Sequence, residues 1–145
     1  MVLHPEPARP HDLAGGLDLL RRCEQAQQDV AARWGHYFVV REDDGRVVGL
    51  AGLEVYGADG LLRGVAVDPD YRGQGLAAAL VEAVVARARL LDLRAVYVLT
   101  TNARDYFLRH GFGDSERGAA PSTIRESWEF RNGPPSAVLM RHPLT

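Results

Sequence analysis

A chain of 145 residues, 46% of them hydrophobic and 25% charged, fits one soluble domain spanning residues 1–145. Its formal net charge of -2 and its lack of a long apolar run argue against nucleic acid and membranes as partners, so we expect a cytoplasmic protein that binds a small molecule. All 17 basic side chains are arginines, which excludes Schiff-base enzymes, pyridoxal-phosphate sites and Walker-type phosphate loops, because each of them requires a lysine.

The N-terminal third is predicted to be mainly helical. A short strand is expected near Val2 and Leu3. Leucines at helical spacing then predict a helix over residues 10–23, and a second helix is expected over residues 24–33.

Three strands are predicted next, because aromatic and β-branched residues cluster between turn sequences. They cover residues 36–42, 46–56 and 61–67. The turn sequences DDG and GADG join them, so neighbouring strands should form antiparallel hairpins.

The C-terminal half adds a crossover. An apolar stripe predicts a helix over residues 75–91, followed by a buried strand over residues 94–100 that should run parallel to strand 61–67. The remaining predictions are a helix over 103–110 ended by Gly111, a helix starting at an N-cap Ser122, and a strand over 136–141. The resulting fold class is α/β (α+β), with a mixed central sheet of antiparallel N-terminal strands and one parallel βαβ crossover, flanked by helices.

Metal binding and disulfide chemistry are not expected. Cys23 is the single cysteine, and its helical spacing from Leu19 and Leu20 favours a buried thiol over a nucleophile. The five histidines lack the HExxH spacing of a zinc site.

The stretch LLRGVAVDPDYRGQGLA, residues 61–77, joins a strand to a helix through a glycine-rich turn. Such a junction leaves main-chain N–H groups unpaired at the positive end of the helix dipole, which suits a phosphate group. Two alternatives are a plain tight turn and a dinucleotide fingerprint of the Rossmann type. The fingerprint requires an acidic residue at the end of the next strand, where this sequence has Leu99, Thr100 and Thr101.

The turn RGQGLA resembles the R/Q-x-x-G-x-G/A loop of the GNAT acetyltransferases, and the order of the elements agrees with that family along nearly the whole chain. The runs GLEVYG, LLRGVAV, YVLTTNARDYFLRHGF and APSTIRESWEF are similar to small GNAT proteins associated with arsenic resistance. YVLTTNARDYFLRHGF is also similar to the acetyltransferase domain of N-acetylglutamate synthases.

The resemblance implies acetyl-CoA as the cosubstrate, with no metal, and it assigns residues to the cofactor. The pyrophosphate would bind the turn, mostly through main-chain N–H groups, and the pantetheine arm would pair with the preceding strand. The implied cofactor-binding residues are Val65, Ala66, Val67, Arg72, Gly73, Gln74, Gly75, Leu76, Ala77 and Thr100. The N–H of Val67 is the candidate for polarising the thioester carbonyl.

Glu54 is the candidate general base, because a carboxylate in an otherwise apolar strand is expensive unless it is used or paired. The alternative is a structural ion pair with Arg63 across the hairpin. In a combined role, Arg63 would hold a substrate carboxylate while Glu54 receives the amine, with Thr101 also near the substrate. For this we expect Arg63 to share one strand face with Leu61, Val65 and Val67.

The general acid is less evident. The usual tyrosine of the family corresponds to Phe107 here, and Tyr106 lies one residue earlier, a helical step of about 100°. Tyr106 is the candidate catalytic acid, and a partly buried aromatic without a catalytic role is the alternative.

The resemblance implies an N-acetyltransferase whose acceptor is a small amine, a glutamate-like amino acid or its arsenic- or phosphorus-containing analogue, and Arg63 and Glu54 fit the charges of such a substrate. A non-catalytic acyl-CoA-binding domain is the alternative, and a homodimer is compatible with either.

Overall fold

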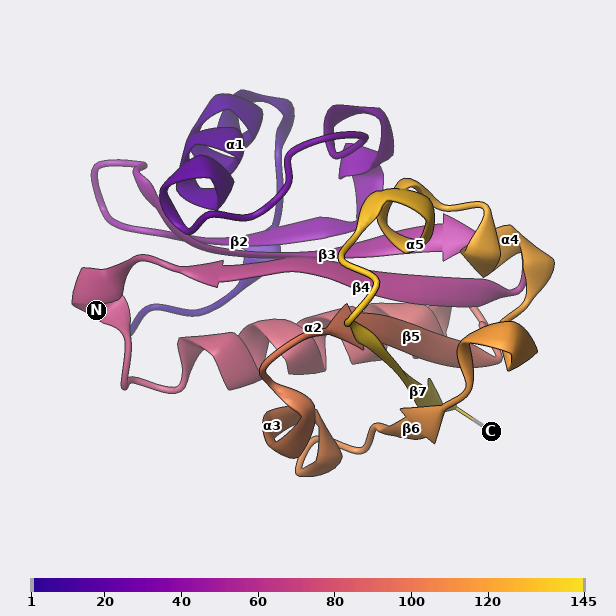
Figure 1. Cartoon of the computed structure of the whole chain (residues 1–145). Coiled ribbons are helices and arrows are strands. Elements are labelled where there is room, and N and C mark those ends of the chain that lie inside the picture. Colours follow the sequence, from indigo (N-terminus) through magenta and orange to yellow (C-terminus); the bar gives the residue numbers. More distant parts are fainter. Residues whose placement is uncertain (1, 145) are drawn as a thin grey trace.

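The computed structural model describes residues 2–144, and its centre is a seven-stranded sheet in the order β1-β2-β3-β4-β5-β7-β6 (Figure 1). The strands are β1 (Glu6–Pro7), β2 (Tyr37–Arg41), β3 (Val47–Tyr56), β4 (Asp59–Val67), β5 (Ala95–Thr100), β6 (Gly113–Ser115) and β7 (Val138–Pro143). Strands β4 and β5 pair in parallel, and the other neighbours are antiparallel. The predicted mixed sheet with one parallel crossover is confirmed.

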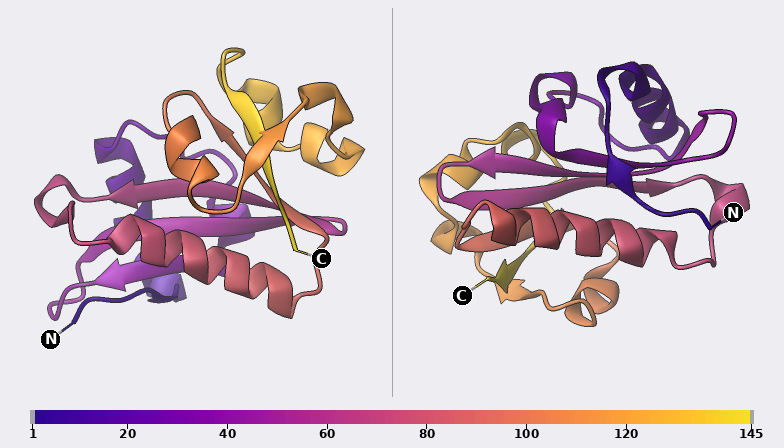
Figure 2. Two further views of the ribbon diagram at one scale, coloured as in Figure 1. Left: turned by 90° about the horizontal axis from the view of Figure 1, so that it is seen from below. Right: turned by 180° about the vertical axis from the view of Figure 1, so that it is seen from behind.

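Helices cover both faces of this sheet. They are α1 (Leu13–Arg22), α2 (Leu76–Leu90), α3 (Arg104–Leu108), α4 (Ser122–Arg125) and α5 (Trp128–Asn132). Figure 2 shows α2 lying along one face, with α1 and the α4–α5 segment on the other. The largest apolar cluster lies between α2 and the sheet, as the stripe of α2 predicts. None of the helices within residues 2–144 is long and apolar enough to cross a membrane.

The N-terminal region differs from the prediction at two places. Residues Val2 and Leu3 are not in a strand, and the first strand is β1. The helix predicted over residues 24–33 is also absent from this segment, because Glu24 and Asp29 adopt left-handed conformations with φ of 59° and 72°. A left-handed residue cannot continue a right-handed helix, so the chain forms an irregular loop before a 3-10 segment at Ala31–His36.

The C-terminal region contains two short helices, α4 and α5, where one was predicted. Ser122 is the first residue of α4, and its side chain makes no capping hydrogen bond within residues 2–144. The Ser127 hydroxyl is the N-cap of α5 and accepts a hydrogen bond from the Phe130 N–H at 3.3 Å. Strand β6 was missed, because the three residues Gly113–Ser115 carry no apolar alternation.

A bulge in β4 decides which side chains face the site. From Leu50 to Gly52, β3 advances two residues, while its partner β4 advances three, from Ala66 back to Arg63. Gly64 supplies the extra residue with φ of +70°. The bulge reverses the alternation, so the prediction that Arg63 shares a face with Val65 and Val67 is wrong.

Arg63 instead lies on the α5 side, where its guanidinium carbon is 5.0 Å from the centre of the Trp128 ring. Val65 and Val67 pack with the core under α2, on the opposite face. The bulge therefore separates the arginine from the two valines that follow it.

Candidate active site

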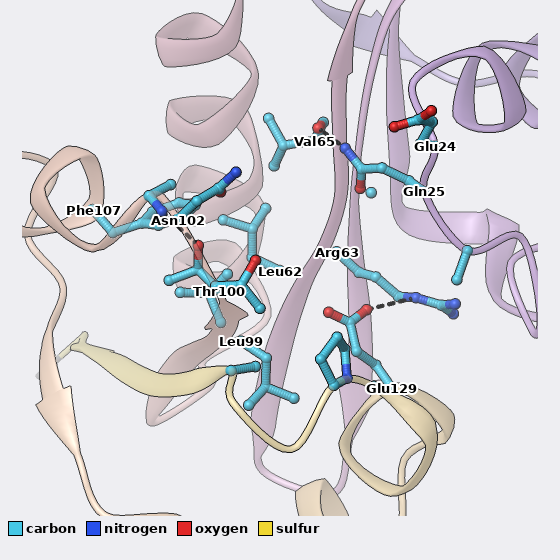
Figure 3. A pocket seen from close by; sticks show the side chains of 18 of the residues that line it. Glu24, Gln25, Leu62, Arg63, Val65, Leu99, Thr100, Asn102, Phe107 and Glu129 are labelled. Atoms are coloured by element: carbon cyan, nitrogen blue, oxygen red, sulfur yellow. Dashed lines mark hydrogen bonds and ion pairs between the residues drawn. The ribbon is translucent and has the colours of Figure 1, made fainter.

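A cleft opens where β4 and β5 separate. Their ladder pairs Gly60 with Val96 and Leu61 with Tyr97, and the described residues show no further pairs between these strands. A cavity of about 660 Å³ lies in this opening (Figure 3). Its walls come from β4, β5, the loop after α1, helix α3 and the α5 segment. The cavity brings together Arg63, Val65, Thr100, Thr101 and Tyr106, all predicted site residues, and adds Gln25, Arg117 and Glu129.

The edge of β4 turns main-chain polar groups toward this cleft. The Asp68 N–H donates to the Val48 carbonyl at 2.9 Å, and because main-chain groups alternate along a strand, those of Val67 point away from β3. The Val67 carbonyl accepts from Arg72 Nε at 3.0 Å, and the Val65 carbonyl accepts from the Gln25 amide. Side chains of the protein itself thus occupy two acceptors to which the pantetheine arm was predicted to pair.

The glycine-rich turn is open. Gly73 and Gly75 both have φ of +81°, and a Cβ added to either would meet no heavy atom within 4 Å. Within residues 2–144, the N–H groups of residues 73–78 have no hydrogen-bond acceptor. These N–H groups precede and begin the 15-residue helix α2, so they can hold an anion together with the positive end of its dipole.

The side chains of the turn contribute little to this anion site. The side chain of Leu76, the first residue of α2, is buried, and Gln74 is exposed. The Arg72 guanidinium bonds the Val67 carbonyl through Nε and lies 3.8 Å from the Cys23 sulfur through Nη2. Cys23 is partly exposed and lines the cavity, so the prediction of a buried thiol is not met. The turn therefore offers mainly main-chain donors.

A buried ion-pair cluster lies beside the cleft. The Arg63 guanidinium bonds Glu54 Oε2 at 3.2 Å through Nη1 and Glu129 Oε2 at 2.8 Å through Nε. The hydroxyls of Tyr37 and Tyr56 donate to the two oxygens of Glu54 at 2.6 and 2.9 Å. Burial and the nearby Glu54 carboxylate raise the pKa of both tyrosines, so these hydroxyls stay protonated.

The two carboxylates of this cluster have different surroundings. The Glu54 side chain is 1% exposed, has partners on both oxygens and does not line the cavity. This geometry fits the structural ion pair with Arg63 that the sequence left open as an alternative to the general base. The Glu129 side chain lines the cavity and is 23% exposed, and burial raises its pKa to about 7, with Arg63 opposing and Glu54 adding to the shift.

Tyr106 also reaches the cavity. Its hydroxyl is buried and has no hydrogen-bond partner among residues 2–144, and burial raises the pKa of this phenol. Phe107, at the usual tyrosine position of the family, lines the same cavity. Thr100 Oγ1 accepts from the Ala103 N–H at 3.0 Å and so shapes the turn after β5, while Thr101 is exposed at the cavity wall.

Residues 7–112 match the Acetyltransferase (GNAT) family. The chain belongs to this family. The predicted family is confirmed, and the predicted enzyme class, N-acetyltransferase, and cosubstrate, acetyl-CoA, are those of this family. Among residues 2–144, no group of three or more His, Cys, Asp and Glu side chains could hold a metal ion.

The most similar curated relatives include several amino-acid acetyltransferases. The amino-acid acetyltransferase of Azotobacter vinelandii is 36% identical over 128 residues, covering 83% of this chain and 30% of the relative. That of Mycobacterium tuberculosis is 44% identical over 73 residues, covering 50% of this chain and 41% of the relative. The chain thus spans less than half the length of these relatives.

Solved structures agree on the fold. The N-acetylglutamate synthase of Neisseria gonorrhoeae, complexed with coenzyme A and N-acetyl-glutamate, matches the whole chain with a TM-score of 0.86 at 19% identity, over 36% of its own length. A Mycobacterium tuberculosis protein in complex with CoA matches 97% of this chain and 99% of its own, with a TM-score of 0.79 at 27% identity. The similarity to N-acetylglutamate synthase that the sequence indicated is confirmed.

Proposed function

We propose that this domain, residues 1–145, acetylates the α-amine of a small amino acid whose side chain carries an anionic group. The observation that carries the proposal is one cavity that offers charges of both signs and is lined by β4, the strand that leads into the open anion turn. Glu129 supplies the negative charge, and Arg117 supplies the positive charge.

Arg117 is suited to an anionic substrate group because its own partners are uncharged. Its guanidinium donates to the main-chain carbonyls of Ala137 at 2.9 Å and Phe130 at 3.5 Å, and its central carbon lies 4.6 Å from the centre of the Phe130 ring. In the described part of the chain it has no carboxylate within ion-pair distance. Its positive charge is therefore uncompensated, and a planar guanidinium matches a carboxylate well.

The cofactor assignment follows the main-chain donors. The diphosphate of acetyl-CoA would bind the N–H groups of Gly73, Gln74, Gly75, Leu76 and Ala77, where the glycines leave room for phosphate oxygens. The pantetheine arm would pair with the cleft edge formed by residues 65–67, displacing the Gln25 and Arg72 side chains from the carbonyls that they hold. The Val67 N–H then polarises the thioester carbonyl.

Glutamate-like amino acids are the acceptors to test first, together with their arsenic- and phosphorus-containing analogues. The amino-acid acetyltransferase relatives and the resemblance to arsenic-associated GNAT proteins both support this choice. Arg63 was the predicted ligand of the substrate carboxylate, but two carboxylates of the protein already bond it, so we assign that role to Arg117. Thr101, exposed at the wall, remains a candidate substrate contact.

A non-catalytic CoA-binding domain is the second candidate. Phe107 favours it, because a phenyl ring at this cavity position cannot protonate a leaving thiolate. Binding of CoA measured by calorimetry, with no turnover of any amine, would support this candidate.

The test is release of free thiol from acetyl-CoA over a panel of amines: L-glutamate, its phosphinate and arsenical analogues, neutral amino acids, an aminoglycoside and a peptide amine. We expect turnover with the anionic amino acids. Arg117→Met should raise KM for them by about 10-fold or more, while Arg125→Met, an exposed arginine on α4, should not change it. Turnover confined to aminoglycosides or peptide amines would refute the proposed substrate class.

A further inference from the structure

The buried ion-pair cluster beside the cleft contains more carboxylates than cations. One guanidinium, Arg63, stands between two carboxylates, Glu54 and Glu129, and the Arg63 side chain is only 2% exposed. If both carboxylates are ionised, the cluster carries one net negative charge in a poorly hydrated place, which is unfavourable without a further cation or proton. An ammonium group entering the cleft would supply both.

Glu129 is the member of the cluster that an incoming group can reach. One of its oxygens, Oε2, forms the ion pair with Arg63 Nε, and no partner within residues 2–144 contacts the other. In Figure 3 this second oxygen points away from Arg63, across the cleft toward the side of Leu99 and Thr100. Glu54, by contrast, has donors on both oxygens and does not line the cavity.

We propose that Glu129 is the catalytic residue that binds the substrate ammonium and accepts its proton, and that Arg63 and Glu54 are positioning residues. Arg63 fixes the orientation of the Glu129 carboxylate. Glu54, held by Tyr37 and Tyr56, fixes Arg63 in turn. This inference rests on the proposed function and adds to it the identity of the base.

The proton balance of the transfer is complete with these groups. An ammonium loses two protons when it becomes an amide. The first passes to the free oxygen of Glu129, and the freed nitrogen lone pair forms the new C–N bond at the thioester carbonyl carbon as the C–S bond breaks. The departing thiolate becomes a thiol by taking a proton from Tyr106, whose buried hydroxyl has no partner in the described part of the chain. The second proton then leaves the nitrogen and reprotonates Tyr106, and Glu129 releases the first proton to solvent.

Charged and titratable groups around Glu129 support this role. Arg63 of β4, Glu54 of β3 and Tyr37 of β2 interact with its charge, and Arg117 and Glu24 line the same cavity. Burial raises the pKa of Glu129 to about 7, with Arg63 lowering and Glu54 raising it. A base with a pKa near the working pH is ionised in half of the molecules and still takes up a proton readily.

The variant test compares Glu129→Gln with Glu126→Gln, which removes an exposed carboxylate from the same segment. Glutamine keeps an oxygen for Arg63, so we expect both variants to fold. Glu129→Gln should lower kcat by about 100-fold or more with little change in CoA affinity, and Glu129→Asp should recover part of the activity. Glu126→Gln should keep wild-type kcat.

The pH dependence gives a second readout. Because ionised Glu129 acts on the ammonium form of the acceptor, kcat/KM should rise through a pKa near 7 and fall again where the ammonium of the acceptor deprotonates. The rising limb should vanish in Glu129→Gln. A profile that only rises, up to the pKa of the acceptor amine, would mean that the enzyme takes the neutral amine from solution, and would overturn the proposal.

A third readout needs no turnover. In protein with 13C-labelled glutamate carboxylates, the signal that Glu129→Gln removes should titrate with a midpoint near 7 in the wild type. A midpoint near the ordinary value of 4.5 overturns the inference, as does unchanged kcat in Glu129→Gln. In either of these outcomes the proposed function survives if the amine panel shows turnover, whereas a panel without any turnover refutes the proposed function and this inference together.

Discussion

At the scale of single residues, the Tyr106 hydroxyl should lower the stability of the fold and, in the proposed reaction, donate a proton to the leaving thiolate. Its hydroxyl is buried and finds no partner in the described structure, and such a group lowers stability by about 1–3 kcal/mol. Tyr106→Phe should therefore leave the free energy of unfolding unchanged or raise it, while kcat falls by about 10-fold or more because the thiolate loses its proton donor. Urea denaturation and steady-state kinetics measure the two effects.

A matched control is Tyr71→Phe, since the Tyr71 hydroxyl donates to Glu42 at 2.6 Å outside the cavity. This variant should lose stability by about 1 kcal/mol and keep its kcat. If Tyr106→Phe behaved in the same way, Tyr106 would be a packing residue and not an acid.

The residues of the site differ in how far the sequence could reveal them. The Glu54–Arg63 pair could be predicted, because both residues interrupt apolar strands joined by a short turn, so the hairpin brings them together. The role of Glu129 could not be predicted, since it lies 66 residues after Arg63 in a segment where charged residues usually face solvent. Only the packing of α5 over β4 turns it inward.

At the scale of elements, the junction between β4 and α2 is the part of the site that the sequence predicts best. Glycines at 73 and 75, directly before an apolar helical stripe, indicate both the turn and its free N–H groups. The interaction is local, so no distant part of the chain has to be placed first.

The test of this junction is Gly75→Ala. The added Cβ would meet no described atom within 4 Å, but it would occupy the space that we assign to phosphate oxygens, and it forces an alanine into a left-handed conformation, which costs about 1–2 kcal/mol. We expect the affinity for CoA to fall by about 10-fold or more, measured by calorimetry.

Gly45→Ala is the control for the backbone strain, because Gly45 also has a positive φ, of +88°, with nothing within 4 Å. It should lose similar stability and bind CoA as the wild type does. Equal affinity of Gly75→Ala and the wild type would exclude the turn as the diphosphate site.

Elements held by long-range contacts were predicted less well. The helix expected over residues 24–33 is consistent with its composition, yet the Gln25 side chain bonds the Val65 carbonyl and the backbone turns left-handed at Glu24. Likewise, the bulge at Gly64 places Arg63 on the sheet face opposite to Val65 and Val67, and no alternation pattern in the sequence indicates this bulge. Such features depend on distant neighbours, and the Gln25–Val65 contact joins residues 40 positions apart.

At the scale of the whole molecule, the order of the elements was sufficient to predict the mixed sheet. Hairpin turns determine the antiparallel part, and a strand–helix–strand unit determines the parallel pair. The width of the opening between β4 and β5, and the charges that line it, depend on packing between both halves of the chain, and the sequence pattern does not report these.

Because the cofactor would bridge the two separated strands, CoA should stabilise the entire fold. At a CoA concentration 100 times its Kd, the free energy of unfolding should rise by about 2.7 kcal/mol, which corresponds to an increase in Tm of about 5–11 °C for a domain of this size. Differential scanning calorimetry with and without CoA measures this shift. An unchanged Tm at millimolar CoA would argue against the binding mode, and Gly75→Ala should show a much smaller shift than Gly45→Ala.

The side chains of Gln25 and Arg72 already satisfy the carbonyls of Val65 and Val67. A ligand arm that pairs with this strand therefore exchanges one set of hydrogen bonds for another and gains little net free energy from them. Discrimination between full-length CoA and shorter pantetheine thioesters should then come almost entirely from the nucleotide end, so that a truncated acyl donor would be a poor substrate even though it carries the same reactive bond.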